Sequence, residues 1–227
     1  MTLWRPAGTA DSERLPLLVV HDGPAYAAEA RLTAHAARLI GAGRLPAHRI
    51  ALLDPGAREE WYSASALYAR ALVGEVLPAV ARLVAVEGAP VGMGASLGGL
   101  AMLHAQRRHP RAFAGLFLQS GSFFMPRFDH MEKGFARYGR IVRFVRALVR
   151  EQRFDGPVPV ALTCAADEDN VHNNRRVAAA LALQGYPTTL HETGGVHDFA
   201  SWRGALEPHL AALLATVWGT ADAAPPR

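Results

Sequence analysis

The sequence predicts an α/β fold, in which a mostly parallel sheet is covered by helices on both faces. Short apolar runs of strand length alternate along the chain with longer stretches of helix-forming residues, which is typical of consecutive βαβ units. Most of these runs are rich in apolar residues, which suits a parallel sheet covered on both faces. A chain of 227 residues has the right length for one domain of this kind.

The elements follow in a regular order. The expected strands are Leu15–His21, Arg49–Leu53, Pro90–Met93, Ala114–Gln119, Val158–Cys164 and Thr188–Glu192, preceded by a short N-terminal strand at Leu3–Arg5. The expected helices are Ala28–Ile40, Ala64–Val86, Leu97–His109, Val171–Leu183 and a last one from about Ala200 to Val217. We expect one domain over residues 1–218. The small, polar, proline-containing tail 219–227 is expected to be disordered.

The most informative motif is Gly94-Ala95-Ser96-Leu97-Gly98, which has the G-x-S-x-G pattern and stands between an expected strand and an expected helix. In that context the pattern predicts a nucleophile elbow, in which a strained turn exposes the Ser96 hydroxyl. The glycines let neighbouring backbone pass closely. The N–H of Leu97, at the start of the helix, would face an oxyanion formed on Ser96. The alternative is a glycine-rich turn whose serine only caps a helix.

A nucleophile of this kind needs an acid and a histidine later in the chain. His197 lies in a glycine-rich loop between the last expected strand and the last helix, which suits a general base. Asp167, Glu168 and Asp169 follow the strand before it. We select Asp167 as the acid because it is the first carboxylate after the strand. One of these carboxylates could instead cap the next helix.

These residues resemble the putative-esterase branch of the α/β-hydrolases, which includes enterochelin esterases, feruloyl esterases, S-formylglutathione hydrolase and the antigen 85 mycolyltransferases. The resemblance covers nearly the whole chain. Besides the elbow, it is carried by Leu17-Leu18-Val19-Val20-His21-Asp22-Gly23, Arg58-Glu59-Glu60-Trp61-Tyr62, Glu75-Val76-Leu77-Pro78, Gln119-Ser120-Gly121-Ser122-Phe123-Phe124, Gly194-Gly195-Val196-His197-Asp198 and Trp202-Arg203. Relatives often have Gly-Gly-His-Asp at the histidine, where this chain inserts Val196.

The resemblance implies further site residues. The family's acid, an Asp or Glu a few residues after its strand, matches Asp167 best and leaves Glu168 open. The family's second oxyanion donor comes from the loop after the first long strand. Pro24 has no N–H there, so Gly23 or Ala25 remains. Arg58 contacts a polar substrate group in some relatives, although here it could simply pair with Glu59 or Glu60.

The segment from about residue 123 to 153 breaks the alternation and stands where α/β-hydrolases insert lids. Phe123 and Phe124 begin an aromatic patch that could wall the substrate pocket or pack as core. An amphipathic helix follows, with five arginines on one arc and apolar residues on the other: Arg140, Arg143, Arg146, Arg150 and Arg153. We favour a core-packed helix with a solvated face over an anion-binding or membrane-binding role.

Composition excludes several other classes. The net charge is +4, but 23 of the 24 basic residues are arginines scattered among alanines, and no nucleic-acid-binding signature is present. The single cysteine, Cys164, cannot form an internal disulfide and has an apolar setting. We find no signal peptide or membrane span, and expect a cytoplasmic protein that needs no metal or organic cofactor.

The predicted activity is hydrolysis of a small-molecule carboxylic ester through an acyl-enzyme on Ser96, with His197 as base and Asp167 as acid. Two alternatives stay open. An acyltransferase would use the same residues to pass the acyl group to an alcohol. A non-enzymatic binding protein could retain the scaffold without the chemistry.

Overall fold

The computed structural model describes residues 1–219 and is built around a seven-stranded sheet with the order β1-β3-β2-β4-β5-β6-β7. The strands are β1 (Thr2–Trp4), β2 (Leu17–Val20), β3 (Arg49–Leu52), β4 (Val91–Ala95), β5 (Gly115–Gln119), β6 (Val160–Ala165) and β7 (Thr188–Thr193). Only β1 runs antiparallel to its neighbour β3, and the other pairs are parallel. The predicted mostly parallel sheet is therefore confirmed. The tail predicted to be disordered lies, from residue 220 onward, outside the described residues.

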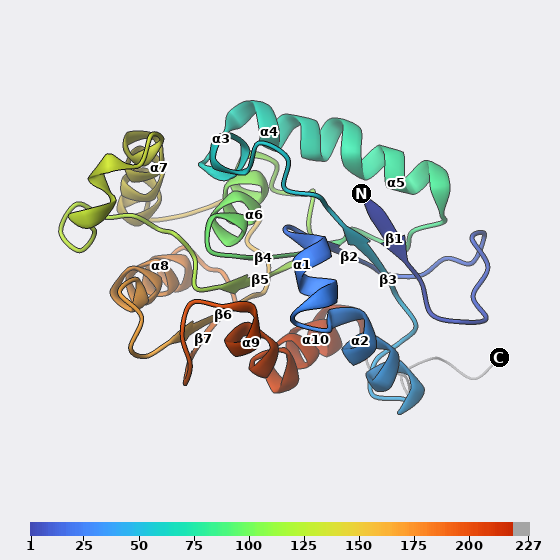
Figure 1. The fold of residues 1–227 in the computed structure, drawn as a ribbon. Coiled ribbons are helices and arrows are strands. Elements are labelled where there is room, and N and C mark those ends of the chain that lie inside the picture. Colours follow the sequence, from blue (N-terminus) through green and yellow to red (C-terminus); the bar gives the residue numbers. More distant parts are fainter. Residues whose placement is uncertain (220–227) are drawn as a thin grey trace.

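Helices cover both faces of this sheet, as Figure 1 shows. On one face lie α3 (Arg58–Tyr62), α4 (Ala66–Ala71), η1 (Leu72–Val76), α5 (Leu77–Leu83) and α6 (Leu97–Arg108), with α7 (Tyr138–Arg150) and α8 (Val171–Leu183) at one end. On the other face lie α1 (Gly23–Ala28), α2 (Leu32–Gly41), α9 (Phe199–Gly204), η3 (Leu206–Leu210) and α10 (Ala211–Trp218). A hydrophobic cluster fills each interface.

Two expected helices are divided in the structure. The last expected helix, from about Ala200 to Val217, forms α9, η3 and α10, with a non-helical backbone at Glu207 (φ −126°). The helix expected over Ala28–Ile40 begins only at Leu32, as α2, because Arg31 before it takes the left-handed conformation (φ 52°). The stretch expected over Ala64–Val86 forms α4, a wider π-helical turn at η1 and then α5. The helix expected over Val171–Leu183 has the predicted bounds.

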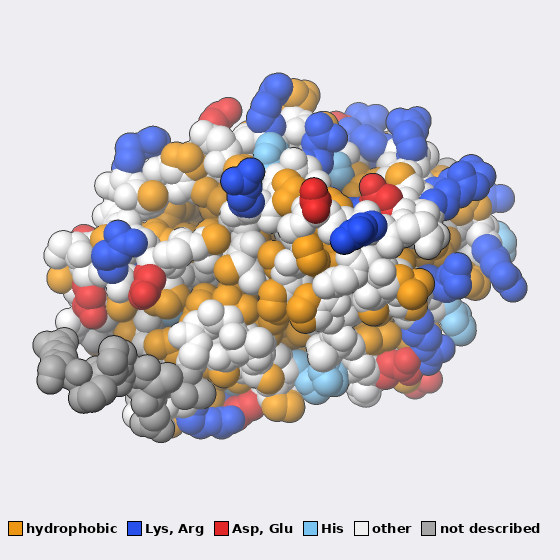
Figure 2. Space-filling view, turned by 180° about the vertical axis from the view of Figure 1, so that it is seen from behind, with side chains coloured by type: hydrophobic (Ala, Val, Ile, Leu, Met, Phe, Trp, Pro, Cys, Tyr) orange, Lys and Arg blue, Asp and Glu red, His pale blue; other side chains and the backbone are white. Residues whose placement is uncertain are grey.

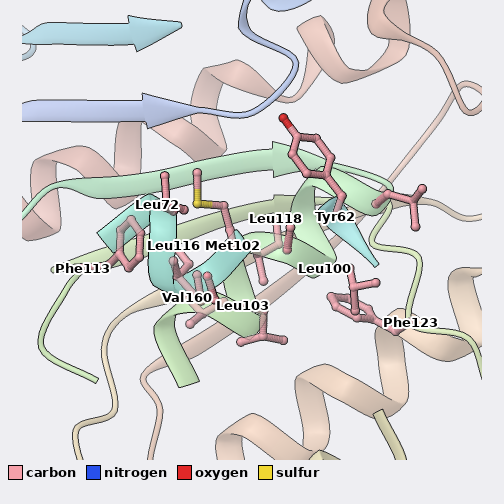
Figure 3. Packing of buried hydrophobic residues seen from close by; sticks show 14 of the residues in the cluster. Tyr62, Leu72, Leu100, Met102, Leu103, Phe113, Leu116, Leu118, Phe123 and Val160 are labelled. Atoms are coloured by element: carbon pink, nitrogen blue, oxygen red, sulfur yellow. The ribbon is translucent and has the colours of Figure 1, made fainter. Parts of the chain in front are cut away.

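The larger cluster packs α6 against the sheet. Figure 3 shows Leu103 of α6 among Leu100, Leu116 and Val160, and each of these residues is 0 or 1 % exposed. Phe123 also packs into this cluster, with no exposed surface. Since α6 begins at the residue after Ser96, this packing fixes the position of the proposed nucleophile relative to the sheet.

We expect Leu103→Ala to lower the free energy of unfolding by about 2–5 kcal/mol, because it removes a fully buried side chain and leaves a cavity. Leu183→Ala is the matched control, since Leu183 is 82 % exposed, and should change that free energy by no more than about 0.5 kcal/mol. Urea unfolding of both variants measures the difference. Equal effects would contradict the packing described for α6.

The segment expected as a lid, residues 123–153, contains a short η2 turn (Met131–Gly134) and α7. Ile141, Val145 and Leu148 of α7 are buried, so the core-packed interpretation of this helix is confirmed. Arg140 binds the carboxylate of Glu60 and two backbone carbonyls, whereas Arg143, Arg146 and Arg150 are exposed. Figure 2 shows basic side chains gathered at the end of the molecule that carries α7. Movement of this segment as a lid stays a prediction.

No helix within residues 1–219 is long and apolar enough to cross a bilayer. In the same part of the chain, no three His, Cys, Asp or Glu side chains are grouped so that they could hold a metal ion. The cytoplasmic location, the absence of a nucleic-acid partner and the independence from cofactors stay predictions.

Candidate active site

The candidate site lies where the parallel strands end. Ala95, at the end of β4, pairs with Gln119 of β5, and Gln119 pairs with Thr163 of β6. The loops after these strands therefore begin level with one another, beside the loops after β2 and β7. Strand order also reverses here, since β3 and β4 lie on opposite sides of β2. In open α/β sheets such a switch point is the usual position of a binding crevice.

Ser96 occupies a strained turn between β4 and α6, with φ 55° and ψ −125°. A Cβ atom on Gly94 would lie 2.5 Å from the carbonyl carbon of Gly98, so the turn closes only with glycine at that position. This is the geometry that the G-x-S-x-G motif predicts. The Ser96 hydroxyl lies 3.0 Å from the hydroxyl of Ser122, which is its hydrogen-bond partner here.

His197 and Glu168 form the other half of the site. The Nδ1 atom of His197 lies 2.7 Å from a carboxylate oxygen of Glu168. The other Glu168 oxygen accepts hydrogen bonds from the Ser120 hydroxyl at 2.7 Å and the Ala165 amide at 3.1 Å. Burial by itself would raise the pKa of Glu168, but these hydrogen bonds outweigh it and lower the pKa below its usual value. The carboxylate is therefore ionised at neutral pH.

The structure corrects the choice of carboxylate. The side chain of Asp167 is exposed and does not bond to His197, whereas Glu168 makes the contact with His197. After β6 ends at Ala165 the chain turns, and the Glu168 carboxylate folds back onto the Ala165 amide while Asp167 points outward. From the sequence we selected Asp167 because it is the first carboxylate after the strand. The conformation of the turn decides instead which carboxylate faces His197.

Two cavities meet at Ser96 and His197. The first, of about 360 Å³, is lined by residues of the loops after β2, β3 and β7: Asp22, Pro24, Ala25, Pro55, Arg58, Phe199 and Trp202. The second, of about 590 Å³, has aromatic walls at Phe124, Phe128 and Phe135 and carboxylates at Asp129, Glu132 and Asp169. A bound ester could therefore place its two parts on opposite sides of the serine.

The loop after β2 narrows the choice of oxyanion donor. The Gly23 N–H donates to the Leu53 carbonyl at 2.9 Å, so Gly23 has no free amide for a substrate. Ala25 lines the first cavity in the opening turn of α1, where amides have no helical acceptor. Leu97, the first residue of α6, is in the same situation beside Ser96. Ala25 and Leu97 are thus the donors that the geometry favours.

Of the three predicted substrate contacts, two line a cavity and one is buried in the core. Arg58 lines the first cavity and donates two hydrogen bonds of 2.9 Å to Asp22, rather than pairing with Glu59 or Glu60. Phe124 lines the second cavity. Phe123 does not, because its ring folds back over Gly121, where a Cβ would lie 2.3 Å from the ring, and so enters the core.

His21, the first residue after β2, is fully buried. Its Nδ1 lies 2.9 Å from the carbonyl of Gly98 in α6, and its Nε2 lies 2.8 Å from the Tyr68 hydroxyl. These contacts tie the loop after β2 to the start of α6. Complete burial lowers the pKa of His21 to about 4, although the hydrogen bond to Gly98 acts against it.

This lowered pKa predicts an acid sensitivity. Between pH 6.5 and about 4 the unfolded chain binds a proton at His21 that the folded chain does not, so stability falls as the pH falls. The loss from this group approaches roughly 3 kcal/mol at the lower end. Imidazole NMR should show His21 titrating near pH 4 in the folded protein. A midpoint near 6.5 would contradict the buried, neutral ring.

A serine at a left-handed strand-to-helix turn, with a histidine and a carboxylate on loops after later parallel strands, defines an α/β-hydrolase. The chain belongs to the family described as "Putative esterase", whose model matches residues 3–213. This is the family that the motifs resemble. The fold class predicted from the sequence is thereby confirmed.

The relatives agree with this class. The chain is 31 % identical over 211 residues to an iron(III) enterobactin esterase of Dickeya dadantii (strain 3937), a match over 84 % of this chain and 46 % of the relative. It therefore spans about half the length of that relative.

Solved structures show the same fold. An enterobactin esterase from Shigella flexneri has a TM-score of 0.76 at 24 % identity, over 95 % of this chain and 55 % of that one. A ferulic acid esterase has a TM-score of 0.73 at 17 % identity, over 93 % and 90 %. The fluorophosphonate-binding serine hydrolase FphF of Staphylococcus aureus has a TM-score of 0.65 at 14 % identity, over 95 % and 90 %.

Proposed function

We propose that this chain hydrolyses carboxylic esters through an acyl-enzyme on Ser96, with His197 as general base and Glu168 as the acid of the triad. The observation that carries the proposal is the position of His197, which bonds to the ionised Glu168 and shares both cavities with Ser96. Glu168 fixes the proton on Nδ1, so that Nε2 is free to accept a proton.

The reaction begins when the Ser96 hydroxyl turns from Ser122 toward His197, which takes its proton as the oxygen attacks the ester carbonyl. The amides of Leu97 and Ala25 stabilise the resulting oxyanion. His197 then gives the proton to the leaving alcohol. Water attacks the acyl-enzyme, passes its proton to His197, and the proton returns to Ser96 as the free acid leaves.

For the substrate we propose an ester with an aromatic acyl or alcohol group. Phe124, Phe128 and Phe135 provide aromatic walls for one side of the ester, and Phe199 and Trp202 for the other. Related proteins are named for ferulic acid and enterobactin, and the Shigella enzyme was crystallised in the presence of a dihydroxy-N-benzoyl amino acid. Aryl esters should therefore have a lower KM than alkyl esters of equal size.

The test is the intact mass after treatment with a fluorophosphonate, combined with turnover of p-nitrophenyl esters. We expect one adduct on the wild type, and neither adduct nor turnover for Ser96→Ala, because only Ser96 has the elbow geometry. Ser122→Ala is the control, since its neighbouring hydroxyl should not be the labelled atom. A folded wild type that is neither labelled nor active would favour the binding-protein alternative.

Acyl transfer needs its own assay, because it uses the same residues. Hydrolysis predicts free acid as the product even when an alcohol acceptor is added in excess. A new ester in place of the free acid would favour the acyltransferase. Ser96 lines both cavities, so either water or an alcohol could reach the acyl-enzyme. Product analysis, not geometry, therefore separates hydrolysis from acyl transfer.

A further inference from the structure

A line of hydrogen bonds leads from Trp202 of α9 through Ser120 and Glu168 to His197, whose side chain is exposed. The indole Nε1 of Trp202 lies 3.0 Å from the Ser120 hydroxyl, which lies 2.7 Å from one oxygen of Glu168. The second Glu168 oxygen lies 2.7 Å from Nδ1 of His197. Ser120 has no exposed surface, and Trp202 is 7 % exposed. The line therefore starts in the protein interior, where hydrogen bonds are strong and unpaired groups are costly, and ends at the exposed His197.

The direction of each hydrogen bond in this line is fixed. An indole N–H can only donate, so the Ser120 oxygen accepts from Trp202. The Ser120 hydroxyl has a single proton, and the oxygen of an ionised carboxylate can only accept, so that proton points at Glu168. Glu168 in turn accepts from His197, whose proton must lie on Nδ1. With Glu168 ionised and His197 neutral, this is the one proton arrangement that satisfies all four groups.

The backbone holds Ser120 in this place. It directly follows β5 and has a positive φ of 46°, a conformation that non-glycine residues rarely adopt. Its N–H donates to the Thr163 carbonyl at 2.7 Å, and Asn170 donates to its carbonyl at 2.8 Å. Such strain persists only where the surroundings hold it, and it is concentrated at functional sites.

Trp202 also touches the histidine directly. Its ring meets the His197 imidazole edge to face, with centroids 5.1 Å apart and planes at 80°. Trp202 therefore acts on His197 in two ways. Its ring restrains the orientation of the imidazole, and its N–H acts through Ser120 and Glu168 on the position of the Nδ1 proton.

We infer that Trp202 and Ser120 are positioning residues that hold His197 in the Nδ1–H tautomer, the form in which Nε2 can accept the proton of Ser96. This inference rests on the proposed function for its catalytic meaning, whereas the tautomer can be measured without any turnover. Ser120 lines neither cavity and acts through Glu168 on the protonation of the base. Trp202 acts by the same route and also through its ring contact with His197.

The experiment uses Trp202→Phe and Ser120→Ala in the full chain. The tautomer of His197 is measured by ¹⁵N imidazole NMR at a pH where the ring is neutral. The Phe variant keeps an aromatic ring at this position and removes the N–H together with one ring of the indole. We expect a single Nδ1–H tautomer in the wild type and a mixture with the Nε2–H form in both variants. Trp218→Phe is the matched control, because the buried indole N–H of Trp218 has no partner within the described residues and should leave the tautomer unchanged.

Turnover gives a second readout. We expect kcat to fall roughly 5- to 10-fold in Trp202→Phe and roughly 10- to 100-fold in Ser120→Ala, because hydrogen bonds to charged groups are the stronger ones. KM should stay within about twofold in Ser120→Ala, since Ser120 lines neither cavity. The double variant should be no slower than Ser120→Ala alone, because Trp202 loses its route to Glu168 once the hydroxyl is gone.

Two results would overturn the inference: an unchanged tautomer in both variants, or losses in kcat that add fully in the double variant, which indicate packing effects alone. Thermal unfolding of each variant checks that the protein is folded. A wild type with the expected tautomer but no ester turnover would contradict the proposed function and leave the inference standing. Rescue of kcat by Ser120→Thr, which restores a hydroxyl, would support it further.

Discussion

Glu168→Gln is expected to lower kcat for ester hydrolysis by roughly 10³- to 10⁴-fold, the effect of replacing a triad carboxylate by its amide. Glutamine has nearly the shape of glutamate but no charge to stabilise the imidazolium of His197. Its amide can also turn its NH₂ group toward Nδ1, which favours the wrong tautomer of the histidine. Steady-state kinetics on a p-nitrophenyl ester, with KM determined separately, measures the loss.

Asp167→Asn is the matched control for that substitution. Asp167 is exposed and lies next to Glu168 in the chain, so this variant removes a neighbouring charge without touching the contact with His197. We expect its kcat to stay within roughly threefold of the wild type, as for a surface substitution. Severe loss in Asp167→Asn together with normal activity in Glu168→Gln would assign the acid to Asp167 instead.

Gly94→Ala is expected to abolish fluorophosphonate labelling and to lower the free energy of unfolding by about 3 kcal/mol or more. The new methyl group would lie 2.5 Å from the Gly98 carbonyl carbon and 2.9 Å from the Gly99 nitrogen. Both are backbone atoms at the start of α6, so no side chain can rotate away to make room. The turn would have to open, and Ser96 would leave the position in which Leu97 faces the oxyanion.

Gly139→Ala tests whether this cost comes from the close approach. Gly139 lies in α7, and a Cβ added there would meet nothing within 4 Å. Alanine should raise helix stability by roughly 0.5–1 kcal/mol and leave labelling unchanged. Calorimetry and intact mass on the two glycine variants give both readouts. Normal labelling of a folded Gly94→Ala protein would contradict the elbow geometry.

Local patterns were enough to locate the elbow and most of the fold. Ser96 stands between a strand and a helix whose composition is visible in the sequence, and the glycines around it are required by a turn of a few residues. The strands were predicted to within about two residues. For β2 to β6 the reason is burial along the whole strand, which leaves mostly apolar runs, whereas β7 is only partly buried. The late start of the first expected helix was not predicted, since Arg31 gives no sign of its left-handed conformation.

Which residues position His197 is decided by contacts between distant parts of the chain. Ser120 and Trp202 stood in segments recognised by resemblance, but their link to each other spans 82 positions. Phe123 and Phe124 look alike in the sequence, although one enters the core and the other lines a cavity. Gly23 and Ala25 are equivalent in the sequence as oxyanion donors, and only the hydrogen bond from Gly23 to Leu53 distinguishes them.

By itself, then, the sequence determined the parallel sheet, the strained serine and the late histidine, because each follows from a periodicity or a backbone requirement within a few neighbouring residues. The tertiary structure alone decided that Glu168 rather than Asp167 meets His197, which amide remains free, and that Trp202 reaches Glu168 through Ser120. These outcomes depend on the direction in which a side chain leaves its turn and on donors and acceptors brought together from separate strands. Sequence spacing carries no information about either.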